Sequence, residues 1–176
     1  MKNECIDGQY REIRELYDYL MQNKEVSFAM DVQEHYKKIL LLSAASLFES
    51  QISKIILDYS SYVSSGDERI VQLIKSKVIE RQYHTLFDWK ANNSNVFWKL
   101  YGEETKNKVR KEIDNNIELK KAEGNFMDLG KRRNLLVHEN FSEYNINITV
   151  DEIYEEYNSA CTFVEYIRKI LLSPKK

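Results

Sequence analysis

The sequence is poor in residues that break helices and in residues that cross-link chains. Five glycines and one proline among 176 residues argue against collagen-like, disordered and turn-rich all-β proteins. The two cysteines, Cys5 and Cys161, are too few for a disulfide framework, and no matching histidine cluster accompanies them for zinc. We therefore expect reduced thiols in a cytoplasmic protein, and neither a metal nor another cofactor.

The sequence also lacks an excess of charge of one sign and long apolar runs. With 26 Lys and Arg against 28 Asp and Glu, the net charge of −2 does not favour a basic coat for nucleic acid or membranes, although it permits a local basic site. The charged N-terminal residues lack the apolar core of a signal peptide. No uninterrupted apolar run approaches the ~18 residues of a membrane span. We expect one domain over residues 1–176, with no membrane partner.

Apolar residues recur at helical spacing along nearly the whole chain. The most sustained seam predicts a long central helix over about residues 28–60. A capping box at Thr149 and Glu152 opens the last helix, and residues 144–148 are expected to form an extended link. Other helices are predicted over residues 7–23, 68–80, 103–121 and 125–140, with Gly124 separating the last two and two short helices between 81 and 101. The pattern predicts a single all-α bundle.

The helix predicted over residues 125–140 carries three polar side chains on one broad face. At ~100° per residue, Asn134 and His138 are stacked one turn apart, and Arg133 lies on the flank of the same face. Leu136 points elsewhere and can anchor the helix in its own bundle. The apolar side of the helix can therefore be buried while Arg133, Asn134 and His138 face another molecule.

Residues 133–138, Arg-Asn-Leu-Leu-Val-His, resemble the Arg-polar-x3-His motif of HEPN ribonucleases, in which the polar residue directly follows the arginine. The segments SAASLFESQI, RQYHTLFDWKANNSNVFWKLYG and LGKRRNLLVHENF are most similar to the RiboL-PSP-HEPN branch. The resemblance spans about residues 31–172. It implies a HEPN-like bundle and a homodimer whose two motif helices face each other across a cleft that cleaves single-stranded RNA without a metal.

In that reaction the RNA supplies its own nucleophile, the 2′-hydroxyl, so the enzyme needs a base and a fixed cation. The resemblance makes His138 the base, or the acid for the 5′-oxygen when the second subunit contributes it, since histidine has an unperturbed pKa of ~6.5. Arg133 would stabilise the phosphorane through its planar fork of donors. Asn134 would orient the phosphate or His138. Glu49 is a candidate for orienting the arginine, with an ordinary surface glutamate as the alternative.

Other cations are candidates for RNA contacts. Lys131 and Arg132 can hold flanking phosphates, or they can be ordinary solvated charges. Arg81 and His84 lie among aromatic residues, and such interleaving can stack bases and hold a strand. Aromatic side chains at this spacing more often build a core, which is the alternative here.

Two functions from different classes follow. The first is a metal-independent endoribonuclease that leaves a 2′,3′-cyclic phosphate and acts as a toxin or phage-defence effector, with an antitoxin or regulatory protein as a candidate partner. The second is a catalytically silent HEPN module that binds RNA, a nucleotide or a protein and provides dimerisation. A structural bundle with an accidental motif is a third interpretation.

Overall fold

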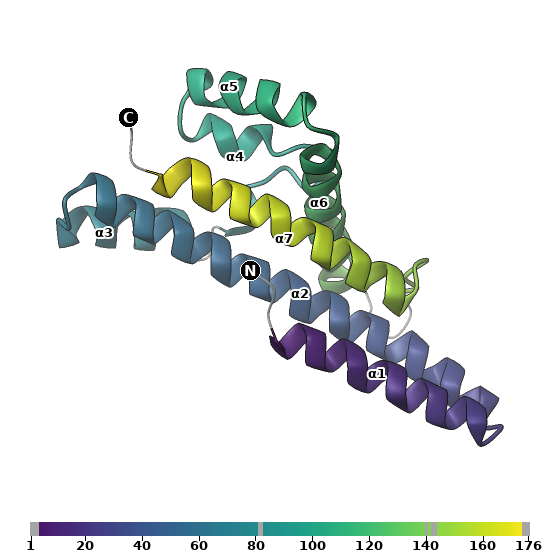
Figure 1. Cartoon of the computed structure of the whole chain (residues 1–176). Coiled ribbons are helices and arrows are strands. Elements are labelled where there is room, and N and C mark those ends of the chain that lie inside the picture. Colours follow the sequence, from purple (N-terminus) through teal and green to yellow (C-terminus); the bar gives the residue numbers. More distant parts are fainter. Residues whose placement is uncertain (1–3, 81–82, 140, 142–143, 174–176) are drawn as a thin grey trace.

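Seven α-helices account for most of the computed structural model, which describes residues 4–80, 83–139, 141 and 144–173 (Figure 1). No strand occurs in these residues, so the predicted all-α class is confirmed. A π-helical turn at Lys75–Ile79 and a 3-10 turn at Tyr83–Thr85 add to the helices. The helices are α1 Glu4–Gln22, α2 Val26–Val63, α3 Glu68–Ile74, α4 Asn95–Lys99, α5 Glu103–Asp114, α6 Ile117–His138 and α7 Val150–Leu172.

α2 is the long central helix that the sequence predicts. It packs against α1, α6 and α7, and α1 runs along it in the opposite direction (Figure 1). Its buried apolar side chains recur at helical spacing, which places one continuous seam against these neighbours. They are Ala29, Leu40, Leu41, Ala44, Phe48, Ile52, Ile55 and Ile56.

Aromatic rings fill the space between α2, α6 and α7. The ring centroid of Phe126 on α6 lies 5.6 Å from that of Phe48 on α2 and 5.3 Å from that of Phe163 on α7. It also lies 5.0 Å from the centroid of Phe87, in the segment before α4. Such tilted and edge-on pairs add to the free energy gained from area burial, and they join the irregular segment to the helical core.

The start of α6 differs from the prediction. The sequence interpretation placed a helix break at Gly124, which is wrong, because α6 runs through Gly124 from Ile117. The break lies earlier, where the Asn116 side chain accepts a hydrogen bond of 3.0 Å from the backbone N–H of Leu119 and caps the helix. A cap of this kind contributes about 1 kcal/mol, which offsets the cost of ~1 kcal/mol for one glycine in a helix interior.

Side-chain caps also begin two other helices. Asp67 accepts a hydrogen bond from the backbone N–H of Arg69 at the start of α3. Thr149 and Glu152 form the predicted capping box of α7. The link at residues 144–148 contains neither helix nor strand.

A buried carboxylate ties α5 and the segment before α4 to α6. Glu123 on α6 is 2% exposed and accepts hydrogen bonds from the Ser94 hydroxyl at 2.5 Å and the Ser94 backbone N–H at 2.9 Å. The Arg110 guanidinium on α5 donates to both oxygens of the same carboxylate, at 3.1 and 2.9 Å. A buried charge needs this degree of compensation, so Glu123 fixes three parts of the chain at one point.

α2 is apolar for a helix of its length. In the part of the chain that the structure describes, it alone is long and apolar enough to cross a bilayer by length and composition, although the sequence shows no uninterrupted apolar run of that size. A core helix of a packed bundle passes the same test, and 44% of the most apolar 18-residue window of α2 is buried. Packing against α1, α6 and α7 accounts for this buried part.

Candidate functional site

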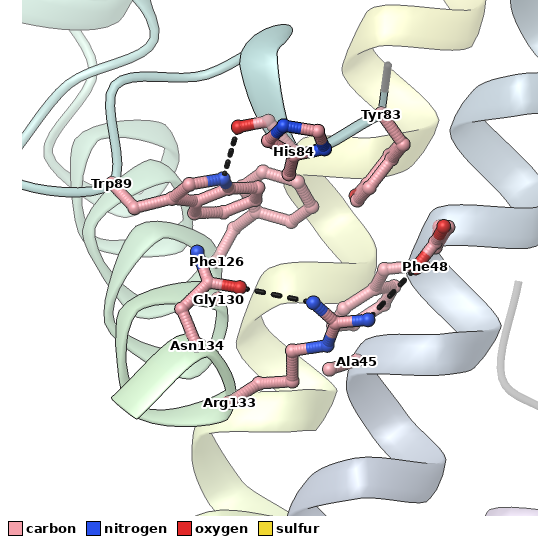
Figure 2. A pocket seen from close by; sticks show the side chains of 10 residues that line it. Ala45, Phe48, Tyr83, His84, Trp89, Phe126, Gly130, Arg133 and Asn134 are labelled. Atoms are coloured by element: carbon pink, nitrogen blue, oxygen red, sulfur yellow. Dashed lines mark hydrogen bonds and ion pairs between the residues drawn. The ribbon is translucent and has the colours of Figure 1, made fainter. Parts of the chain in front are cut away.

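A small pocket lies between α2, α6 and the segment that begins with the 3-10 turn (Figure 2). Its free space of about 20 Å³ holds roughly one water molecule. Apolar and aromatic side chains form most of the wall, and a few polar groups converge on it. The lining residues are Ala45, Phe48, Glu49, Tyr83, His84, Trp89, Phe126, Gly130, Arg133 and Asn134.

The polar side of the pocket is built around Arg133. One terminal nitrogen of its guanidinium donates a hydrogen bond of 3.0 Å to the Asn134 Oδ1, and the other lies 3.5 Å from Glu49 Oε2. The Arg133 and Glu49 side chains are 32% and 39% exposed, so solvent and ligands reach them. A guanidinium has five N–H donors, and these contacts leave several for a phosphate.

The aromatic side of the pocket rests on a glycine that the sequence reasoning did not single out. A Cβ atom at Gly130 would lie only 1.9 Å from a ring carbon of Trp89, so the indole packs directly on the α6 backbone, one turn before Arg133. The Trp89 Nε1–H donates a hydrogen bond of 3.0 Å to the backbone carbonyl of His84 (Figure 2). The sequence signal that could have predicted this contact is a glycine inside a helix, three residues before Arg133, because such a glycine often has a packing role.

Tyr83 lies close to the Arg133–Glu49 pair in the same pocket. Burial raises the pKa of its hydroxyl above the usual value, the Glu49 carboxylate raises it further, and Arg133 lowers it. The phenol therefore stays protonated at neutral pH and keeps one donor near the ion pair. From the sequence, Tyr83 was one of the aromatic residues around His84 that could stack bases or build the core, and its place beside the Arg133–Glu49 pair was not predicted.

His138 is placed differently from its two motif partners. It is the last residue of α6, its side chain is exposed, and it does not line the pocket. The structure therefore brings Arg133, Asn134 and Glu49 together and leaves His138 about one and a half turns along the same helix. In a single chain, the His138 imidazole therefore lies outside the pocket that the Arg133 guanidinium lines.

Comparison with known families gives a match to RiboL-PSP-HEPN over residues 6–173. The chain belongs to the RiboL-PSP-HEPN family. The suspected family is thereby confirmed, and HEPN domains have RNA-related functions and often dimerise. Comparisons with curated proteins and with solved structures gave no significant match.

Two further candidates of this HEPN chain, Lys131 and Arg132, do not line the pocket. Lys131 is exposed, whereas Arg132 forms an ion pair with Glu156 on α7. This ion pair joins α6 to α7, so Arg132 is not a freely solvated charge. Burial raises the pKa of the Glu156 carboxyl despite the opposing effect of Arg132. Arg81 lies outside the described residues. Within residues 4–80, 83–139, 141 and 144–173, no group of three His, Cys, Asp or Glu side chains is placed to hold a metal.

Proposed function

We propose that this HEPN chain is a metal-independent endoribonuclease that cleaves single-stranded RNA. The observation that supports this most strongly is the arrangement of Arg133, a guanidinium oriented by Asn134 and Glu49 at the edge of a pocket. An exposed histidine follows on the same helix. A fixed cation and a histidine are the two groups that RNA transesterification requires.

The proposed reaction uses the 2′-hydroxyl as nucleophile. His138 removes its proton while the 2′-oxygen attacks the adjacent phosphorus, and the bond from phosphorus to the 5′-oxygen breaks. His138 of the partner subunit returns a proton to that leaving oxygen, so the products are a 2′,3′-cyclic phosphate and a free 5′-hydroxyl. Arg133 donates hydrogen bonds to the phosphorane oxygens as their charge increases.

Glu49 has a positioning role in this mechanism. Its contact with Arg133 of 3.5 Å holds the guanidinium toward the pocket and partly neutralises it before RNA binds. Asn134 constrains the other side of the same group. Preorganised donors of this kind stabilise a transition state without reorganising during the reaction.

A homodimer would complete the site. Apolar side chains are exposed on α6 beside His138 and just after it, with Leu135 at 38%, Val137 at 54% and Phe141 at 42%. A second copy that covers these residues would remove them from water and bring two copies of His138 near two copies of Arg133. We place the dimer in the cytoplasm as a toxin or phage-defence effector restrained by an antitoxin or regulatory protein.

The test is incubation of purified protein with single-stranded RNA in EDTA. We expect cleavage, 2′,3′-cyclic phosphate ends by mass spectrometry, and a dimer by light scattering. His138→Ala and Arg133→Ala should abolish cleavage without loss of helicity, whereas His35→Ala, which changes an exposed histidine of α2, should cleave as the wild type does. RNA binding without cleavage would instead support the silent module. If the protein neither binds nor cleaves RNA, the result would refute the ribonuclease proposal and support the third interpretation, a structural bundle with an accidental motif.

A further inference from the structure

We propose that His84 stacks an unpaired nucleobase of the RNA beside the phosphate held by Arg133. This base subsite rests on the proposed ribonuclease function and specifies which part of the substrate the pocket edge recognises. Trp89 would act in it as a positioning residue, and Gly130 would provide the seat for Trp89.

The first observation is the placement of His84 relative to Arg133. Both residues line the same pocket, with His84 and Trp89 on one side and Arg133 on the other (Figure 2). One nucleotide that bridges them would have its phosphate on the guanidinium and its base on the aromatic side. Stacking on aromatic and histidine side chains is a general way for proteins to hold unpaired bases.

The second observation is that the pocket is too small for a base. Free space of about 20 Å³ is roughly the volume needed by one water, so a ring must bind at the edge of the pocket. The His84 side chain is exposed there. The base therefore has an accessible ring to stack on without any movement of Trp89 or Phe126.

The third observation is that the backbone of His84 is held in place. Residues 83–85 form a single 3-10 turn, and its carbonyl at His84 accepts the hydrogen bond from Trp89. The Trp89 ring packs on Gly130 and lies 5.1 Å from Phe87 and 5.9 Å from Phe126 between centroids. A stacking platform with a fixed backbone loses less conformational entropy on binding than a free loop does.

A bound base must be unpaired in this arrangement. In a duplex both faces of every internal base are already stacked, so none is available to an external ring. The subsite would thus favour single-stranded RNA on grounds independent of the cleavage chemistry.

The test measures binding in the His138→Ala background, so that cleavage does not interfere. Single-stranded RNA oligonucleotides are prepared with an abasic residue at each position in turn, which removes one base and keeps every phosphate. We expect one position at which base removal weakens binding about tenfold, as stacking on one aromatic group predicts. The same removal should have no effect in the His138→Ala, His84→Ala double variant.

Conservative variants separate stacking from structural loss. His84→Tyr should restore the sensitivity to base removal, because it restores an aromatic ring. Trp89→Phe should reduce it, because the ring remains over Gly130 but the N–H donor to His84 is lost. His35→Ala is the matched control and should leave the tenfold effect unchanged.

The outcomes distinguish the two proposals. Equal losses with and without His84, at every abasic position, would overturn the base subsite and leave the ribonuclease proposal intact. Failure of all forms to bind RNA would refute the proposed function, and the subsite with it. Binding of duplex RNA as tight as that of single-stranded RNA would also overturn the subsite.

Discussion

Substitution of Gly130 by alanine tests the contact on which the pocket wall depends. In this structure the new Cβ would lie 1.9, 2.2 and 2.7 Å from three ring carbons of Trp89, so the indole must move by more than an ångström. Phe87 and Phe126 pack against Trp89 at centroid distances of 5.1 and 5.9 Å, which limits the directions available. The displaced ring would also weaken its hydrogen bond to His84.

The magnitude follows from two opposing terms. Alanine in place of glycine stabilises a helix interior by ~1 kcal/mol, whereas overpacking of this kind costs roughly 1–3 kcal/mol. Gly124 lies on the same helix, and a methyl group added there would meet no neighbouring side chain within 4 Å. Gly124→Ala therefore changes only the helix propensity. The difference in the free energy of unfolding between the two variants measures the cost of overpacking against Trp89.

The assay is thermal and urea unfolding of both variants and the wild type, followed by circular dichroism. We expect Gly124→Ala to raise the Tm by about 2–4 °C for a gain of ~1 kcal/mol in a chain of this size. Gly130→Ala should unfold several degrees below Gly124→Ala and should show weakened RNA binding. Equal stability of the two variants would refute the packing of Trp89 on Gly130.

Three further substitutions test other contacts. Glu123→Ala leaves the Ser94 hydroxyl and backbone N–H without their acceptor and leaves Arg110 with Asp114 as its acidic partner. It should lower the free energy of unfolding by about 3 kcal/mol, measured by urea titration. Thr149→Ala removes a helix cap and should cost about 1 kcal/mol. Hydrogen bonds from Thr149 lower the pKa of Glu152. The stability that this carboxylate contributes is therefore present above its unfolded pKa and is lost as the pH falls through the folded pKa. Thr149→Ala should weaken this dependence of stability on pH. Glu49→Gln should reduce kcat/KM for RNA about fivefold, equivalent to ~1 kcal/mol for a partly exposed ion pair with Arg133.

Each of these three substitutions has an outcome that would contradict the expected role of the residue. An unchanged urea midpoint for Glu123→Ala would show that the carboxylate is not the shared anchor. An acid-unfolding profile of Thr149→Ala identical to that of the wild type would contradict the cap. Full activity of Glu49→Gln would remove Glu49 from the positioning of Arg133.

The sequence predicted two helices from signals within each helix, a long apolar seam and a capping box. α2 follows a seam of this kind, and α7 begins at its capping box. The start of α6 was mispredicted because Gly124 was taken as the break, although the Asn116 side chain caps the helix earlier. Contacts of Glu123 with Ser94 and Arg110 also hold the residues next to Gly124. Long-range contacts of this type do not show in helical periodicity.

Only the part of the candidate site that lies within one helix was predictable. Arg133 and Asn134 are adjacent on one helix, so their proximity follows from helical geometry, whereas the approach of Glu49 from α2 was only one of two alternatives. The contribution of Trp89 and Gly130 depends on how the segment before α4 folds onto α6. Helical spacing within α6 contains no information about that segment.

The shared anchor at Glu123 has a consequence for local unfolding. One carboxylate contacts both α5 and the Ser94 end of the Trp89-bearing segment. Detachment of α5 would remove the cation that compensates this buried charge, so we expect it to weaken the attachment of that segment. Amide protons of α5 and of residues 86–94 should therefore exchange with deuterium as one cooperative unit. A protein or small molecule that holds α5 against the bundle would then slow exchange at the Trp89 wall of the pocket without touching that wall.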